Sequence, residues 1–314
     1  MTTDTAGDSP SMRLGSVTVT YHPDLGVLDA QLRALPESTV KIIVDNASPP
    51  DTLCELQELQ QRLPGVHLLR NDGNAGLAAA LDQGVRALAA RSPPSTHVLL
   101  LDQDSEPHPG SVERLQHAWR QLQDRGAGPV AVGPQLLDPD TGLMHGFHCM
   151  RGWRWSRVFP RPGDAAPSVT NLNGSGTLMR IDDYVALGGL ERELFIDHVD
   201  TEWAFRMLAA GCTLWGVPDA VFTHRMGERG LRVWLLGWRI WPARSPARHR
   251  YLFRNTLWLM RRDYVPRTWK FWAAVKLLLT LVVHAVFDPR RGEQVHAMAQ
   301  GLRDGVRRRR GGAP

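Results

Sequence analysis

The sequence predicts an α/β fold in which helices flank a mostly parallel, doubly wound sheet. Strand patterns alternate with helical patterns through the first third of the chain, which is the order of a parallel sheet built by crossover connections. The strand segments are short apolar runs, as expected for strands covered on both faces. Asp45, Asn71 and Asp102 each follow the end of such a run. Because ligands of these sheets bind beside the carboxyl ends of the strands, we expect a binding site at that edge.

The first elements are predicted from apolar runs that end at turn residues. Residues 14–20 are rich in β-branched side chains and end at Tyr21-His22-Pro23, and the run 40–44 ends at a polar loop with helix-start signals. Pro64-Gly65 ends a helical pattern. The expected strands are 14–20, 40–44, 66–69 and 97–101, and the expected helices are 27–35, 52–63 and 76–90.

The pattern is looser after Gly110. Residues 200–210 read as a helix closed by Gly211, in the position after a helix that favours glycine. A loop with Gly, Arg and Trp residues, 151–167, separates two expected strands. The expected helices are 111–123, 182–187 and 200–210, and the expected strands are 130–132, 172–179, 213–217 and 220–223.

Composition indicates one large domain, or one domain with an appendage. The chain has 314 residues, of which 43% are hydrophobic and 22% charged, so it can bury a substantial core. Cys54, Cys149 and Cys212 are too few and too scattered for a disulfide framework or a zinc site. With no signal peptide pattern at the start, these features favour the reducing cytoplasm.

The net charge of +5 is concentrated in the last third of the chain, which is also rich in tryptophan. A basic tail of this kind can bind an anionic membrane surface or a nucleic acid. Because no nucleic-acid-binding motif accompanies it, we expect it to bind the membrane and no nucleic acid. The apolar run 271–287, which contains Lys276 and His284, is short for a span and favours a helix at the membrane interface. Packing of the tail against the α/β domain is the alternative use of its tryptophans, Trp234, Trp238, Trp241, Trp258, Trp269 and Trp272.

Four regions are therefore expected. Residues 1–12 form a disordered N-terminus, and 13–225 form the α/β domain. Residues 226–300 form a helical, basic, Trp-rich region that associates with membranes, and 301–314 form a disordered basic tail.

Asp102-Gln103-Asp104 is a candidate metal site because two carboxylates follow a buried strand at alternate positions. Mg²⁺ and Mn²⁺ prefer oxygen ligands and often bridge carboxylates to substrate phosphates. His224 ends another expected strand and is a candidate third ligand. An acidic turn that caps the next helix, with a structural histidine, is the alternative.

Two polar loops are candidate nucleotide contacts. Asp45 and Asn46 can hydrogen-bond a base or ribose, or can form an Asx turn before a helix capped by Ser48. The loop from Arg70 to Gly76 combines Gly and Asn residues ahead of a helix N-terminus, which suits an anion. It lacks the spacing of a P-loop or a dinucleotide fingerprint.

A third group of acids lies at the start of the helix expected at 200–210. Asp197, Asp200 and Glu202 all follow the apolar pair Phe195-Ile196. Acids are favourable in any first helical turn, but one carboxylate beside a cleft can also take a proton from an alcohol as a general base.

Together these motifs resemble glycosyltransferase family 2, from about residue 17 to residue 224. The resemblance rests on Val-Thr-Tyr at 19–21, Val-Asp-Asn-Ala-Ser at 44–48, Asn-x-x-Asn-x-Gly at 71–76, Asp-Gln-Asp-Ser at 102–105, Asn-Gly-Ser-Gly-Thr at 173–177 and Asp-x-Glu-Trp at 200–203, followed by a Gly and a His. The Asp-Gln-Asp-Ser and Asp-x-Glu-Trp motifs are most similar to the rhamnosyltransferase branch.

The resemblance implies a GT-A fold for residues 13–225 and roles for particular side chains. It implies a Mg²⁺ or Mn²⁺ site at Asp102, Asp104 and His224, and Asp200 as the base, with Glu202 as its rival. A sugar or acceptor pocket would contain Asn173, Gly174, Ser175 and Trp203. The nucleotide sugar would contact Thr20, Tyr21, Asp45, Asn46, Asn71, Asn74, Gly76, Asp102 and Gln103.

The resemblance also implies an inverting reaction that moves L-rhamnose from dTDP-β-L-rhamnose to a glycan or lipid-linked acceptor in cell-envelope synthesis. The enzyme would then work in the cytoplasm, at the inner face of the membrane. The region 136–167, with Trp153 and Trp155, is expected to shape the acceptor pocket. The alternatives are another nucleotide sugar such as UDP-galactofuranose, a pyrophosphorylase-like transferase, a non-catalytic sugar-nucleotide or membrane-binding module, and nucleic-acid binding through the Arg-rich end.

Overall fold

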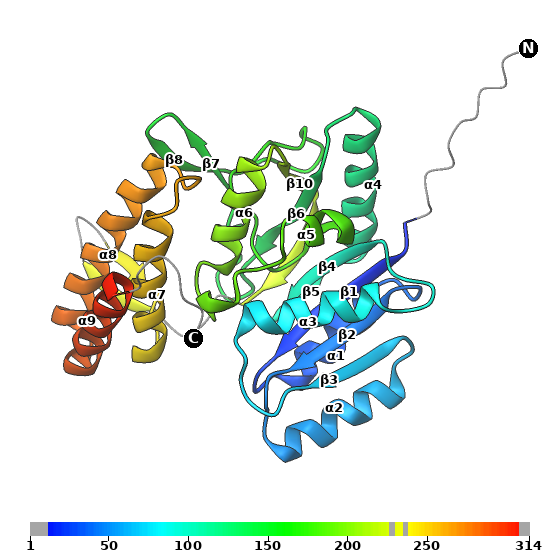
Figure 1. The fold of residues 1–314 in the computed structure, drawn as a ribbon, viewed down its shortest axis with the longest axis horizontal. Helices are drawn as coiled ribbons and strands as arrows, with labels where there is room; N and C mark the ends of the chain where they lie inside the picture. The colour runs from blue at the N-terminus through cyan, green and yellow to red at the C-terminus, as the bar shows by residue number, and fades with distance from the viewer. Residues whose placement is uncertain (1–11, 226–229, 235–237, 308–314) are drawn as a thin grey trace, which may run out of the picture.

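The structure is a computed structural model that describes residues 12–225, 230–234 and 238–307, except for the side chains of 232–240. It contains an eight-stranded sheet with helices on both faces, a separate two-stranded ribbon, and a C-terminal unit of three helices beside them (Figure 1). The predicted disordered stretches lie mostly outside the described residues, since these begin at residue 12 and end at residue 307.

The N-terminal half of the sheet is parallel, as the alternating pattern predicts. Its strands are β1 (Leu14–Thr20), β2 (Val40–Asp45), β3 (Val66–Arg70) and β4 (His97–Asp102), in the spatial order β3-β2-β1-β4. β1 pairs in parallel with both β2 and β4. The carboxyl ends of these strands therefore meet at one edge, where Asp45 and Asp102 lie.

The other half of the sheet is mixed. The order continues β4-β9-β6-β10-β5, with β5 (Ser105–Pro107), β6 (Val130–Leu137), β9 (Thr177–Arg180) and β10 (Thr213–His224). β9 is antiparallel to β4 and β6, and β5 is antiparallel to β10. The two strands expected at 213–217 and 220–223 form one strand with a register shift between Val217 and Val221. Pro218 lies in this shift and has no N–H to donate.

Both faces of the sheet are covered, which explains the continuous apolar strand runs. Ile43 packs with α1 (Leu25–Ala34) and α2 (Pro50–Arg62), while its neighbours Ile42 and Val44 pack with α3 (Leu77–Ala89). Leu99 and Leu101 pack against α4 (Ser111–Asp124). The face that α3 covers also holds α5 (Ile181–Ala186), a short 3₁₀ turn at Arg192–Leu194, and α6 (Val199–Ala209).

A ribbon of β7 (Phe147–Arg151) and β8 (Arg154–Val158) forms where the sequence indicates only a loop. Its turn is held by the C-terminal unit, because Thr268 Oγ1 donates to the Gly152 carbonyl at 2.9 Å. Trp272 Nε1 likewise donates to the Trp153 carbonyl at 3.1 Å. The ribbon thus connects the sheet domain to the last helices.

The C-terminal unit differs in two ways from the helical region and disordered tail that the sequence predicts. It begins with a short antiparallel pair, β11 (Leu231–Trp234) and β12 (Trp238–Trp241), before α7 (Pro246–Met260), α8 (Arg267–Phe287) and α9 (Arg291–Arg307). The helix α9 also continues through 301–307. A Cβ on Gly301 would lie 2.3 Å from the Arg250 carbonyl, so this glycine permits close packing of α9 on α7.

The helix α8 is longer than the apolar run that predicts it. It begins at Arg267, directly after Pro266, and has 21 residues, so by length and composition it is able to cross a membrane. One side nevertheless packs inside the protein. Leu277 packs with Leu252, Phe253 and Met298 of the neighbouring helices, and Trp269 lies in the core of the sheet domain.

Candidate active site

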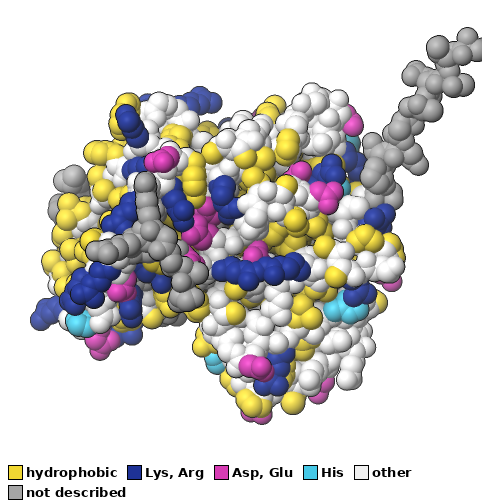
Figure 2. Space-filling view, in the orientation of Figure 1, with side chains coloured by type: hydrophobic (Ala, Val, Ile, Leu, Met, Phe, Trp, Pro, Cys, Tyr) yellow, Lys and Arg dark blue, Asp and Glu magenta, His cyan; other side chains and the backbone are white. Residues whose placement is uncertain are grey.

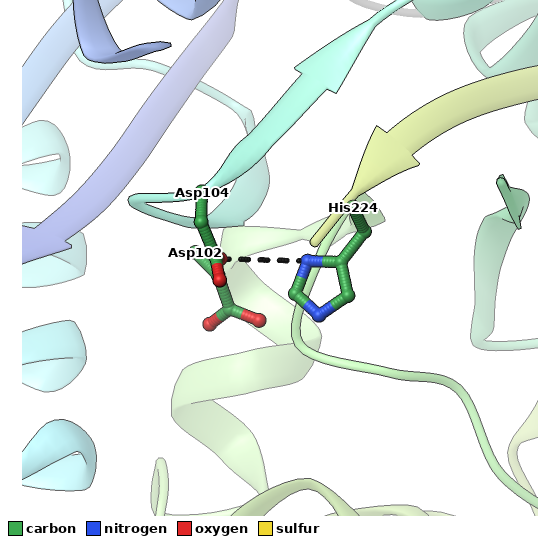
Figure 3. Close-up of side chains that lie close together, drawn as sticks. All are labelled: Asp102, Asp104 and His224. Carbon is green, nitrogen blue, oxygen red and sulfur yellow. Dashed lines mark ion pairs between the residues drawn. The ribbon is translucent and has the colours of Figure 1, made fainter. Parts of the chain in front are cut away.

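Three predicted metal ligands meet at the edge of the sheet (Figure 3). Asp102 ends β4, Asp104 lies in the turn after it, and His224 ends β10. Pairing of His224 with Ser105 across β10 and β5 brings the two segments together. One ligand atom of each residue lies within 4.8 Å of the others, and His224 Nδ1 is 3.4 Å from Asp104 Oδ1.

The electrostatics of this group suit a divalent cation. Burial raises the pKa of Asp104 above its usual value, and the charge of Asp102 adds to the shift, whereas His224 opposes it. Ser175 Oγ donates to the Asp102 carboxylate and lies 3.2 Å from His224 Nδ1. Two carboxylates and an imidazole on one side form the oxygen and nitrogen donor set that Mg²⁺ or Mn²⁺ accepts.

The predicted pocket residues 173–175 adjoin this group through their backbone. A Cβ on Gly174 would lie 3.7 Å from Asp102 Oδ1. The carbonyl of Asn173 accepts a hydrogen bond of 2.6 Å from Thr177 Oγ1. Gly176 has a φ of +93° and its N–H donates to Leu100. The chain therefore turns sharply beside Asp102 before β9 begins, which explains why the strand expected from residue 172 starts only at residue 177.

Asp45 organises the ends of β1 and β2 from a fully buried position. Its carboxylate accepts hydrogen bonds from Thr20 Oγ1 at 3.0 Å, from Ser48 Oγ at 2.6 Å and from Ser48 N at 2.9 Å. The Asx-type turn that the sequence allows is thus present. Asp45 therefore fixes the backbone at the ends of β1 and β2, where a nucleotide would bind.

Asn46 connects the end of β2 to the loop between β3 and α3. Its Oδ1 accepts from Asn71 Nδ2 at 2.9 Å and from Ala75 N at 3.3 Å, and its Nδ2 donates to the Gly76 carbonyl at 3.3 Å. Asn74 Oδ1 accepts from Gly76 N at 2.9 Å. The candidate nucleotide residues of these two loops therefore form one hydrogen-bonded network.

Tyr21 and Gln103 bridge the ends of β1 and β4. Tyr21 N donates to Gln103 Oε1 at 2.7 Å, and Gln103 Nε2 donates back to the Tyr21 carbonyl at 3.2 Å. The Tyr21 side chain is 48% exposed. Its ring is therefore available to a ligand, while its backbone is fixed next to the metal-site turn.

Asp200 lies in the first turn of α6 and is partly exposed. Burial raises its pKa to about 6, and the charge of Asp102 adds to the shift. The only hydrogen bonds to its carboxylate among the described residues come from Thr201, at 2.8 Å from the backbone N–H and 3.4 Å from the hydroxyl. No cation neutralises it there, so it remains free to accept a proton.

Glu202, the alternative base, is held in a structural ion pair. Arg206 donates to both of its oxygens at 2.8 Å, and the Tyr264 hydroxyl donates to Oε1 at 2.6 Å. The residue is fully buried. Trp203 is also in the core, at 3% exposure, rather than on a pocket surface. Glu202 and Trp203 are therefore both buried and packed, and their roles as rival base and as pocket residue stay predictions.

The loop before Asp200 is strained and is held from the C-terminal unit. Phe195, Asp197 and His198 have φ values of 64°, 59° and 67°, a region that non-glycine residues adopt at a cost. Asn255 Nδ2, on α7, donates to the carbonyls of Leu194 at 2.8 Å, Ile196 at 2.7 Å and Asp197 at 2.9 Å. We call residues 194–198 the base loop.

Ion pairs add to this attachment. The buried carboxylate of Asp197 pairs with Arg244, and with Arg248 at 3.0 Å, and these arginines hold its pKa below the usual value despite burial. The base loop also contacts the nucleotide side, because Leu77 N donates to the Phe195 carbonyl at 2.6 Å. Sequence reasoning missed Asn255, Arg244 and Arg248, since no local spacing connects them to a loop about 50 positions away.

Comparisons with known proteins match this architecture. The family model for glycosyl transferase family 2 matches residues 31–181. A curated relative, the dTDP-rhamnosyl transferase RfbF of Shigella flexneri, is 28% identical over 80% of this chain and 81% of its own. The N-acetylglucosaminyl-diphospho-decaprenol L-rhamnosyltransferase of Mycobacterium tuberculosis is 26% identical over 81% of this chain and 85% of its own.

Solved structures support the GT-A-like fold. The structure of GalNAc-T7 with UDP, GalNAc and Mn²⁺ aligns with a TM-score of 0.57 at 15% identity, over 89% of this chain, which spans 59% of that protein. The mannosyltransferase PcManGT from Pyrobaculum calidifontis, in complex with GDP-Man and Mn²⁺, aligns with a TM-score of 0.53 at 17% identity, over 94% of this chain and 87% of its own. The predicted fold class is thus confirmed.

The different settings of Asp200 and Glu202 predict opposite effects on stability. Because the folded-state pKa of Asp200 is above its unfolded value, its contribution to stability is greatest below pH 4 and falls as the pH rises through about 6. Asp200→Asn removes this cost, so at pH 7.5 we expect stabilisation by up to about 3 kcal/mol. Glu202→Gln removes the carboxylate that pairs with Arg206, and we expect it to destabilise the folded protein by about 3 kcal/mol. Urea unfolding measures both, and equal effects of the two variants would contradict the assignment.

Removal of the Asn255 amide should loosen the base loop. In Asn255→Leu the carbonyls of Ile196 and Asp197 lose a donor, at about 1 kcal/mol each, whereas the Leu194 carbonyl still accepts from Arg254 at 3.1 Å. Hydrogen exchange read by mass spectrometry is expected to be faster in peptides that cover residues 192–200, with unchanged protection in the sheet. Gln300→Leu, on α9 away from this loop, is the matched control. Unchanged exchange in Asn255→Leu would show that the loop does not depend on this amide.

Proposed function

We propose that this chain, which belongs to glycosyltransferase family 2 and is rhamnosyltransferase-like in sequence, transfers L-rhamnose from dTDP-β-L-rhamnose to a hydroxyl of a glycan or lipid-linked acceptor. The observation that carries the proposal is the meeting of Asp102, Asp104 and His224 in one group, together with an unpaired Asp200 carboxylate whose pKa the charge of Asp102 helps to raise. Both curated relatives are named as rhamnosyl transferases, which supports the choice of sugar.

The donor would lie across the ends of β1, β2 and β4. The exposed Tyr21 ring offers a surface for the base, and the loops built on Asp45 and Asn46 supply amide and backbone donors. The helix α3 begins directly after Gly76, so its N-terminus faces the same edge and favours an anion. These residues bind and orient the nucleotide.

Asp102, Asp104 and His224 would hold the divalent cation, Mg²⁺ or Mn²⁺. The oxygen-rich donor set supports this assignment, and so do the two solved neighbours, which were determined with Mn²⁺. Such a cation, when bound, neutralises charge on the departing nucleoside diphosphate. Ser175, which donates to the Asp102 carboxylate, orients that ligand.

Asp200 acts as the general base. With a pKa of about 6 it is ionised at neutral pH and still basic enough to receive the proton of the acceptor hydroxyl. The acceptor oxygen attacks the anomeric carbon as the bond to the diphosphate breaks, and the proton goes to the Asp200 carboxylate. Attack opposite the leaving group converts the β-linked donor sugar into an α-L-rhamnoside, with no covalent intermediate on the protein.

The acceptor side of the molecule would face the cytoplasmic surface of a membrane. One face of α8 exposes apolar side chains from Phe271 to Phe287, and lysine and arginine side chains surround the C-terminal helices (Figure 2). Because the opposite side packs against the protein, a helix lying in the interface fits better than a span. The exposed residues are Phe271, Trp272, Leu278, Val282 and Val286, and Trp153 of the β7–β8 turn adjoins them.

The tryptophans of the tail divide between the two expected uses. Trp269 is buried in the core, and Trp258 packs against it. Trp272 is 45% exposed and is the tail tryptophan that we assign to the membrane. Trp241 is partly buried, and the side chains of Trp234 and Trp238 lie outside the described residues.

A panel of nucleotide sugars tests the enzymatic proposal. We expect metal-dependent transfer from dTDP-rhamnose, with a rate that rises with pH through about 6 and then levels off as Asp200 ionises. Asp200→Asn should lose about 100-fold or more in kcat and keep donor binding. Asp104→Ala should lose the metal dependence of donor binding, and the surface variant Asp182→Asn should match wild type.

These experiments test the donor sugar and the general base separately. Preference for another nucleotide sugar would remove rhamnose and leave the mechanism in place. A wild-type rate in Asp200→Asn would overturn the assignment of the base.

Flotation with anionic liposomes tests the membrane surface. The wild-type protein should float with the vesicles, and the triple variant Phe271→Ser, Trp272→Ser, Leu278→Ser should remain in the dense fraction, since each change removes exposed apolar area from α8. Val185→Ser changes a similarly exposed residue on α5 and should float as wild type does. Equal flotation of the triple variant would assign membrane binding to another surface.

A further inference from the structure

A small cavity lies beside the metal-site group, across β4 from the loops where a nucleotide would bind. Its walls come from β6, from β7 and from the segment before β9, and they include His148, Asn171, Asn173 and Ser175. In the sheet, β9 and β6 follow β4 on one side, whereas β1 and β2 lie on the other. The cavity is therefore separate from the network built on the Asp45 and Asn46 loops.

Two polar side chains in the wall of this cavity have an atom without a protein partner. Asn171 is only 9% exposed, and its Oδ1 is buried with no hydrogen bond among the described residues. His148 Nδ1 is buried in the same way within the part of the chain that the structure describes. The two residues are opposite each other in an antiparallel bridge, which places their side chains close together. Because buried polar atoms are almost always paired, these two indicate a bound polar group.

The backbone around both side chains is fixed. The N–H and the hydroxyl of Thr170 both donate to the His148 carbonyl, at 2.9 and 3.0 Å. A Cβ on Gly133 would lie 2.8 Å from Leu172 Cδ2, so the segment that carries Asn171 packs directly on β6. The Trp155 ring lies beside the His148 ring, with the centroids 5.3 Å apart. The two polar groups are thus positioned in advance of binding, as a specific subsite requires.

The size and polarity of the cavity suit a hydroxyl group. Its volume is about 10 Å³, which is roughly the space for one water-sized group and far less than a sugar ring needs. Burial, and then the charge of Arg157, lowers the pKa of His148 to about 4, so the imidazole is neutral at neutral pH. A hydroxyl can donate to Asn171 Oδ1 and also pair with a neutral imidazole. An ionised carboxylate or phosphate oxygen has no hydrogen to donate to Asn171 Oδ1.

The position of the cavity next to the metal-site group indicates which molecule brings the hydroxyl. Ser175 lines the cavity, donates to the Asp102 carboxylate and lies 3.2 Å from His224 Nδ1. Asp102 and His224 would hold the cation that binds the donor diphosphate. The sugar of a nucleotide sugar is bonded directly to that diphosphate, so its ring would lie beside Ser175 and would bring a ring hydroxyl to the cavity.

We propose that Asn171 and His148 form a subsite for one hydroxyl group of a sugar, and that this sugar is the one carried by the donor. The inference rests on the proposed function, since the metal-site group has to hold the diphosphate. A sugar without this hydroxyl would leave both buried atoms unpaired, which is how a site built to bind a hydroxyl rejects an analogue that lacks it. Asn171 and His148 are therefore specificity-determining residues for the donor sugar.

Calorimetric titration of the full-length protein with Mn²⁺ tests the subsite, with dTDP-L-rhamnose and dTDP as the two ligands. Asn171→Leu keeps a side chain of similar shape and removes its polar atoms, so we expect it to weaken binding of dTDP-L-rhamnose at least tenfold and to leave dTDP unchanged. His148→Phe should have the same effect from a separate strand. Gln121→Leu, an exposed change on α4, should match wild type with both ligands.

Binding of dTDP is the internal control for folding, because dTDP uses only the nucleotide loops and the metal-site group. If both variants bind dTDP-L-rhamnose as wild type does, the cavity holds a structural water and the subsite is overturned. Equal losses for dTDP and dTDP-L-rhamnose in both variants would overturn it as well.

Analogues of the donor that each lack one hydroxyl of the rhamnosyl ring identify the group that is bound. Wild type should bind one of them at least tenfold less tightly than dTDP-L-rhamnose, and Asn171→Leu should bind that analogue and dTDP-L-rhamnose equally. If the variants instead keep wild-type donor affinity and raise the KM for the acceptor, the hydroxyl belongs to the acceptor and the donor assignment is overturned.

The subsite and the choice of rhamnose can fail separately. If the protein prefers another nucleotide sugar, the same comparison is made between that sugar nucleotide and its nucleoside diphosphate. A selective loss of the sugar nucleotide in Asn171→Leu would then support the subsite, although the rhamnosyl donor would have failed.

Discussion

The hydrogen bonds from Asn255 to the base loop are the constraint on which the active site depends. Three residues of the loop have left-handed backbone conformations without being glycine, and each costs about 1 to 3 kcal/mol. One buried amide on α7 lies within hydrogen-bond distance of three loop carbonyls, which share its two N–H groups, and offsets part of this cost. Because the same loop contacts Gly76 and Leu77 on the nucleotide side, the C-terminal unit helps to set the geometry of the donor and acceptor halves together.

The two acids of α6, Asp200 and Glu202, lie in different environments. Asp200 and Glu202 are two positions apart, yet Glu202 has Arg206 and Tyr264 on its oxygens, and Asp200 has only Thr201. A paired carboxylate anchors the helix, whereas an unpaired and desolvated one has the raised pKa that proton transfer uses. The protein accepts a cost in stability at Asp200, which fits a functional rather than a structural residue.

The helix α8 joins two chemical environments. Its inner side carries Trp269 into the core of the sheet domain. Its outer side exposes apolar residues, among them Phe271, Leu278 and Val282. The ribbon of β7 and β8 is fixed to α8 through Gly152 and Trp153, so the proposed membrane surface is attached directly to the sheet domain.

The sequence by itself determined the parallel half of the sheet and the placement of Asp45 and Asp102 at its edge, because apolar runs and turn residues are local signals. It also indicated the set of Asp102, Asp104 and His224, since each follows a strand end. Only the tertiary structure gave Asp200 and Glu202 different surroundings, buried Trp203, and produced the β7–β8 ribbon and the extended α9. These outcomes depend on partners such as Tyr264, Asn255 and Arg250, which lie far along the chain, and a contact of that kind leaves no periodic trace in the sequence.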